Sequence, residues 1–70
     1  MSTLELHFKD ATSDKFWKIT LGGRAHTVHF GRQGTQGQQQ TKSFGSERDA
    51  KKSYDKLVAE KLKKGYRETT

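Results

Sequence analysis

Polar and apolar residues alternate through the first third of the chain, in two segments, residues 3–9 and 15–21. Because successive side chains of a strand point to opposite faces, each segment predicts a half-buried strand with one apolar face. The apolar side chains are Leu4, Leu6 and Phe8 in the first segment and Trp17, Ile19 and Leu21 in the second. Residues 10–14 are polar and predict a turn between the strands. Phe16 falls on the opposite face, where the pattern gives it no partner.

Glycines divide the middle of the chain. Gly22-Gly23 predicts a two-residue hairpin turn, because glycine adopts positive φ without steric cost, and a third strand should follow near residues 25–30. Residues 31–40 are rich in glycine and glutamine and predict a long exposed loop. Residues 39–44 can return as a fourth strand at the sheet edge, where their polar composition specifies the register poorly.

The last third of the chain has helical periodicity. Ser46 followed by Asp49 is typical of a helix start, and Gly65 supplies a stop. The apolar residues at helical spacing are Ala50, Tyr54, Leu57, Val58 and Leu62. This stripe and the apolar face of the strands have only each other to cover them. We therefore expect an α+β fold in which a small antiparallel sheet of three to four strands packs against one C-terminal helix, with residues 1–70 forming one domain.

Composition limits what such a chain can do. Its 70 residues include no cysteine and 29% hydrophobic residues, so stability must come from one modest core. Neither an export signal nor a run of about 18 apolar residues is visible, which predicts a soluble, cytoplasmic protein without membrane contact. Fourteen Lys and Arg against eight Asp and Glu give a net charge of +6, which favours polyanionic partners.

The distribution of charge is more informative than its sum. No acidic residue occurs between Lys15 and Ser46, so this segment is the predicted anion-facing surface. Its cations are Lys15, Lys18, Arg24, Arg32 and Lys42. The lysines of the helix are interspersed with acids at helical spacing, as in Glu60 and Lys64, so we expect that surface to be solvated and largely self-neutralised.

The same absence of acids argues against catalysis, because no carboxylate in that segment can serve as general acid, base or metal ligand. We expect no catalytic residues, no cofactor and no small-molecule substrate. His26 and His29 are three residues apart on a predicted strand and would point to opposite faces, with no cysteine or carboxylate to complete a metal site. Both are expected at the surface, and no metal site is predicted.

Residues 30–38, Phe-Gly-Arg-Gln-Gly-Thr-Gln-Gly-Gln, resemble the signature of WGR domains, in which an aromatic residue, Gly and Arg precede a glycine-rich turn that ends Gly-Gln. Residues 15–19 resemble the early aromatic strand of that family, and residues 50–66 resemble its closing helix. Phe30 stands where the family name has tryptophan. WGR domains occur in poly(ADP-ribose) polymerases, where they help detect DNA breaks and relay that signal, and in bacterial proteins that include molybdate-regulator-like ones.

The resemblance implies a non-catalytic nucleic-acid-binding module that prefers DNA to RNA, at ends, nicks or other features that do not depend on sequence. It would place Phe30 against a nucleotide sugar or base and Arg32 at the interface, although burial of Phe30 beside Val28 is an equal alternative. The full set of predicted interface residues is Arg32, Phe30, Gly31, Lys15, Lys18, Arg24, Gln38 and Lys42.

Two other functions stay open at this point. A protein interaction module is compatible with the relay role of the family, and nucleic-acid binding would differ from it by a steep dependence on salt. Strands followed by a lysine-rich helix also suggest a double-stranded RNA-binding domain, but the N-terminal helix of that fold is missing from the pattern.

Overall fold

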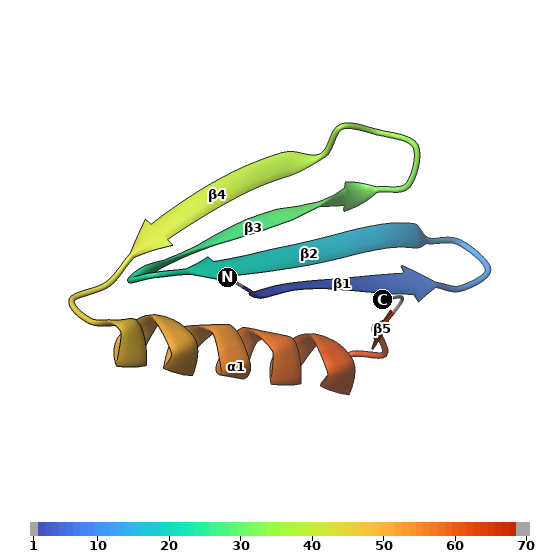
Figure 1. Ribbon diagram of the computed structural model, residues 1–70. Helices are drawn as coiled ribbons and strands as arrows, with labels where there is room; N and C mark the ends of the chain where they lie inside the picture. Colours follow the sequence, from blue (N-terminus) through green and yellow to red (C-terminus); the bar gives the residue numbers. More distant parts are fainter. Residues whose placement is uncertain (1, 69–70) are drawn as a thin grey trace.

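A computed structural model describes residues 2–68 of the chain. In chain order its elements are β1 (Ser2–Lys9), β2 (Asp14–Gly22), β3 (Ala25–Arg32), β4 (Gln38–Ser43), α1 (Glu47–Lys63) and β5 (Arg67–Glu68). The strands form one antiparallel sheet in the order β4-β3-β2-β1-β5, and α1 lies across one face of it (Figure 1). Within the described residues, no helix is long and apolar enough to cross a membrane.

The predicted α+β class is confirmed, with one addition to the predicted three to four strands. After α1 the chain turns at Gly65, whose φ is +107°, and Arg67 and Glu68 pair with His7 and Leu6 of β1. This fifth strand places the end of the described chain beside the second half of β1 (Figure 1).

The core lies between α1 and the apolar face of the sheet, which the alternation of polar and apolar residues in β1 and β2 had predicted. Leu6 and Ile19 are fully buried and Trp17 is nearly so. In the register of β1 and β2, Leu6 lies opposite Trp17 and Leu4 opposite Ile19, so the predicted faces are correct. The helix contributes the buried Ala50 and packs Tyr54, Leu57 and Val58 against this cluster.

The prediction that Leu62 belongs to the inward-facing stripe of the helix is wrong. Leu62 is 49% exposed, and the neighbouring Lys61 is the residue whose side chain faces Trp17. The helix ends themselves match the prediction. The hydroxyl of Ser46 accepts a hydrogen bond from the backbone N–H of Asp49 at 3.2 Å, which satisfies one free donor of the first turn.

The β2–β3 hairpin closes one residue later than predicted. Gly22 pairs with Ala25, so the two turn residues are Gly23 and Arg24. Gly23 has a φ of +59°, whereas Arg24 does not enter the positive region. Either Gly22 or Gly23 could adopt the positive φ of the turn. The cross-strand register sets Leu21 opposite His26 and Gly22 opposite Ala25, which leaves Gly23 in the turn.

The glycine-rich loop is exposed, as predicted, but it is shorter than predicted and its glycines lie close to the sheet. β3 continues through Arg32 and β4 begins at Gln38, which leaves residues 33–37 as the loop. A Cβ at position 31 would lie 2.7 Å from the Cα of Gly37, and a Cβ at position 37 would lie 2.8 Å from the ring of Phe16. The loop therefore covers Phe16 on the face opposite α1, which explains an apolar residue that had no predicted partner.

Candidate nucleic-acid interface

Three adjoining hollows follow the seam between α1 and the sheet, with volumes of about 340, 310 and 330 Å³. Lys61 lines all three of them. Trp17 and Phe30 are shared by the first and second, and Lys15 and Tyr66 by the second and third. Because they share walls, the hollows form one continuous surface, which we call the α1 groove.

Strand alternation decides which residues of the signature reach this groove. In the β2–β3 register, Phe30 lies opposite Trp17 and Arg32 lies opposite Lys15, on the face that carries α1. Gly31 lies opposite Phe16, on the other face, although its backbone also lines the second hollow. Phe30 is half-buried against the core, in line with the burial alternative, and the rest of its side chain lines two hollows of the groove. Arg32 is exposed.

Four cations surround the second and third hollows: Lys15, Arg32, Lys61 and Lys64. We call this part of the groove the cationic end. Within residues 2–68, none of the four has a carboxylate within 4.0 Å, and the ion pair on the helix is Lys51–Asp55 instead. Among the described residues, no ion pair therefore neutralises the positive charge at this end.

Lys61 is the most enclosed cation of the groove. Its Nζ lies 5.8 Å from the centroid of the Trp17 ring and 5.3 Å from that of Tyr66, within the range of cation–π attraction. Burial lowers the pKa of Lys61, and the neighbouring Lys64 and Lys15 lower it further, against an opposing contribution from Glu60. An anion bound here would relieve the repulsion among the lysines.

The sequence prediction missed Lys61, Lys64, Trp17 and Tyr66 as groove residues. It assigned the lysines to a self-neutralised helix surface, although α1 presents Lys61 to the sheet. The available signal was spacing, because Lys61 follows Leu57 by one helical turn and therefore continues the inward stripe. A lysine at an inward position is seldom fully buried, so its ammonium group should emerge beside the sheet.

The other predicted interface residues are dispersed. Gln38 pairs with Phe30 and so stands on the groove face, and Lys42 lines the far end of the first hollow. Lys18 lies opposite His29 on the face that α1 does not cover, and Arg24 lies in the β2–β3 turn. The structure brings Lys15, Phe30, Gly31 and Arg32 together and separates Lys18 and Arg24 from them.

The two histidines point to opposite faces, but the prediction that both lie at the surface is wrong for His26. Its side chain is 4% exposed, and its Nε2 lies 2.9 Å from the hydroxyl of Ser53 on α1. On the other face, Nε2 of His29 donates to the carbonyl of Gln36 in the glycine loop. Among the described residues, no group of three or more potential ligands could hold a metal ion.

The chain is thus a small α+β domain in which one helix packs on an antiparallel sheet, with cations and aromatic rings clustered in the groove between them. The family model of the WGR domain matches residues 2–70, and the chain belongs to this family. The resemblance of its signature is thereby confirmed, with phenylalanine in the position of the tryptophan.

Longer bacterial proteins contain similar sequences. The chain is 43% identical over 61 residues to the uncharacterized protein YfeS of Escherichia coli K12, a match that covers 87% of this chain and 25% of YfeS. Protein YehF of the same organism is 43% identical over 59 residues, covering 84% of this chain and 22% of YehF. A crystal structure of a Bacteroides fragilis protein matches with a TM-score of 0.95 at 45% identity, over 99% of this chain and 20% of that one. The chain thus spans a quarter or less of these relatives.

Proposed function

We propose that the α1 groove binds nucleic acid, DNA in preference to RNA, at ends, nicks or other features that do not depend on sequence. The domain performs no catalysis in this proposal. The observation that carries it is the convergence of Arg32, Lys15 and Lys61 beside aromatic rings, with no carboxylate within ion-pairing distance among residues 2–68. Membership of the WGR family supports a nucleic-acid-binding role in general.

The residue types fit distinct parts of a nucleotide. The guanidinium of Arg32 offers a planar fork of donors to a phosphate, whereas Lys15 and Lys61 act as point charges. The exposed part of Phe30 offers a ring face to a base or sugar. Contacts of these kinds position a strand without reading its sequence, which is why the proposal includes little sequence specificity.

A protein partner is the second candidate, and the apolar lining of the first hollow favours it. Salt separates the two, because each phosphate neutralised contributes about −0.9 to the slope of log affinity against log salt. Three to four contacts at the cationic end predict a slope of roughly −3. Titration of labelled blunt duplex, nicked duplex, single strand and RNA at several salt concentrations would measure it. A flat response, or no binding at low salt, would overturn the proposal.

Arg32→Lys tests the specific site against diffuse positive charge. The variant keeps the charge and loses the fork, so the binding free energy should weaken by about 1–3 kcal/mol. Lys52→Ala, which removes one charge from the exposed surface of α1, should cost a few tenths of a kcal/mol. Circular dichroism would verify that both variants are folded. Wild-type affinity for Arg32→Lys would reject the site.

A further inference from the structure

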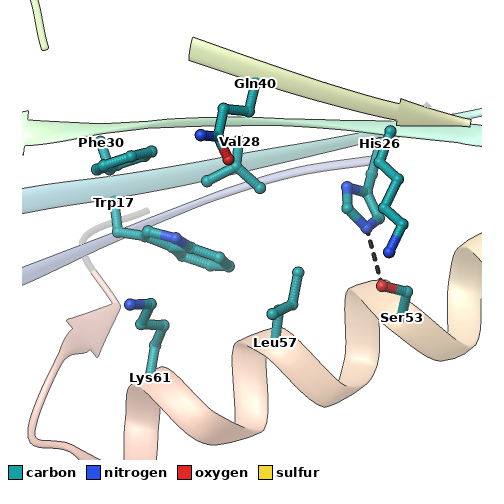
Figure 2. A pocket seen from close by; sticks show the side chains of 9 residues that line it. Trp17, His26, Val28, Phe30, Gln40, Ser53, Leu57 and Lys61 are labelled. Atoms are coloured by element: carbon teal, nitrogen blue, oxygen red, sulfur yellow. Dashed lines mark hydrogen bonds between the residues drawn. The ribbon is translucent and has the colours of Figure 1, made fainter. Parts of the chain in front are cut away.

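The first hollow of the α1 groove differs from the cationic end. Its floor is apolar and consists of Trp17, Val28, Phe30 and Leu57 (Figure 2). Its polar lining comes from His26, Gln40, Lys42, Ser53 and Lys61, and no carboxylate takes part. An apolar floor with a few hydrogen-bonding groups around it, in a volume of about 340 Å³, is the usual composition of a site for a small flat group.

The hollow exists because β4 does not complete the core. The side chains that β4 places on this face are Gln38, Gln40 and Lys42, and all three are exposed. No apolar side chain of β4 therefore covers Val28 and Phe30, which stay half-buried. In a sheet with a complete core, those positions of β4 would carry apolar residues.

His26 gives a second and independent indication of a ligand. Its Nε2 is engaged by Ser53, but its Nδ1 is buried without a hydrogen-bond partner among the described residues. Figure 2 shows this second nitrogen on the side of the ring turned away from the helix and towards Val28. Buried polar atoms normally have a partner, so an unpartnered one in the wall of a hollow points to a group that binds there.

The chemistry of that group follows from the neighbouring cations. Trp17, Phe30 and Lys61 belong both to the first hollow and to the second, which carries Arg32 and Lys15. One ligand can therefore place a flat ring over Phe30 and an adjacent anion on the cationic end. A nucleotide has this arrangement of ring and phosphate.

We infer that the first hollow binds one unpaired nucleobase at the end of a strand whose phosphate lies on the cationic end. The inference rests on the proposed function and adds to it a preference for an overhanging nucleotide. The base stacks on Phe30, and the side-chain amide of Gln40 offers both a donor and an acceptor to its edge, the combination that suits adenine. Gln40 and Lys42 are exposed at the rim of the hollow, so displacement of their side chains would bring the edge of the base to the buried Nδ1 of His26.

Three duplexes of equal length test the inference: one blunt, one with a single unpaired deoxyadenosine at its 5′ end, and one with an abasic residue there. All carry a 5′ phosphate. The adenine overhang should bind roughly fivefold tighter or more than the other two, as expected for one stacked base. Its binding should also change the emission of Trp17, the one tryptophan of the chain. Equal affinity of the adenine and abasic overhangs would overturn the inference.

Neighbouring glutamines supply the matched control. Gln40 lines the hollow, whereas Gln39 pairs with His29 on the opposite face. Gln40→Ala should reduce the advantage of the adenine overhang over the blunt and abasic duplexes, and Gln39→Ala should leave that advantage as it is in the wild type.

The two levels of the proposal fail differently. If all three duplexes bind equally and with a steep salt dependence that Arg32→Lys weakens, the proposed function stands and the nucleobase site is wrong. If none binds in a salt-dependent manner, the proposed function itself fails. A peptide with an aromatic and an acidic residue that binds at Gln40 while no duplex does would assign the groove to a protein partner and overturn both.

Discussion

The two faces of the sheet use their polar groups differently. On the face without the helix, Thr3, Thr20, Thr27 and Thr41 stand side by side across four strands. Their hydroxyls hydrogen-bond in pairs, at 3.2 Å between Thr3 and Thr20 and 3.0 Å between Thr27 and Thr41. On the helix face, the cations of the α1 groove have no such partners within residues 2–68. The threonine hydroxyls of one face therefore pair with each other, whereas in the proposed function the cations of the other face are available to a ligand.

The WGR signature is divided between these faces. Phe30 and Arg32 reach the groove, while Gly31 and Gly37 let the loop approach Phe16 on the opposite side. A single motif therefore contains residues that line the proposed interface and residues that allow the loop to pack. The three residues of the motif are consecutive in the sequence, but successive side chains of a strand point to opposite faces, so the motif is divided between the two faces.

The largest expected effect comes from the core beneath the helix. Leu6→Ala removes a fully buried side chain and should lower the free energy of unfolding by about 2–5 kcal/mol, enough to unfold much of a small domain. Thr27→Ala on the other face breaks one exposed hydrogen bond and should cost about 1 kcal/mol or less. Urea denaturation followed by circular dichroism measures both. Similar losses would contradict the assignment of the core to one face.

The glycine loop should give an intermediate effect. Gly37 has a φ of +69°, and a Cβ there would lie 2.3 Å from the carbonyl oxygen of Phe30. Gly37→Ala should therefore lower the free energy of unfolding by about 2–3 kcal/mol. Gly34 has a φ of +86° but open space around it, so Gly34→Ala isolates the backbone cost, about 1 kcal/mol. Thermal unfolding of the two variants would show whether the close packing around Gly37 adds a destabilising contribution to that of the positive φ. Identical melting temperatures would show that it does not.

The smallest expected effect compares one lysine from each face. Lys61→Met should weaken duplex binding severalfold and reduce the salt slope by about 1, because Lys61 belongs to the cationic end. Lys18→Met removes the same charge from the opposite face and should change the slope little. Fluorescence anisotropy at several salt concentrations measures both. A larger effect at Lys18 would place the interface on the threonine face.

Periodicity predicted most of the fold, because two strands alternate strictly and the helix has clear signals at both ends. It could not predict β5, since Arg67 and Glu68 are too few to form a pattern and acquire their strand conformation from β1. Within the candidate interface, Arg32, Lys15 and Phe30 followed from charge and the signature. Lys61 did not follow, because the prediction placed it on a solvated helix surface from its charge alone. Its position one helical turn after Leu57 is what directs it towards the sheet.

The order of the strands also has a kinetic consequence. β1 to β4 pair with their neighbours in the chain, so each hairpin forms from residues close in sequence, a topology associated with rapid folding. The pairing of β5 with β1 is the exception, because it joins residues 67–68 to residues 6–7. Loop closure over that separation costs entropy that only the completed core repays. We therefore expect the meander and helix to assemble first, with β5 pairing with β1 last.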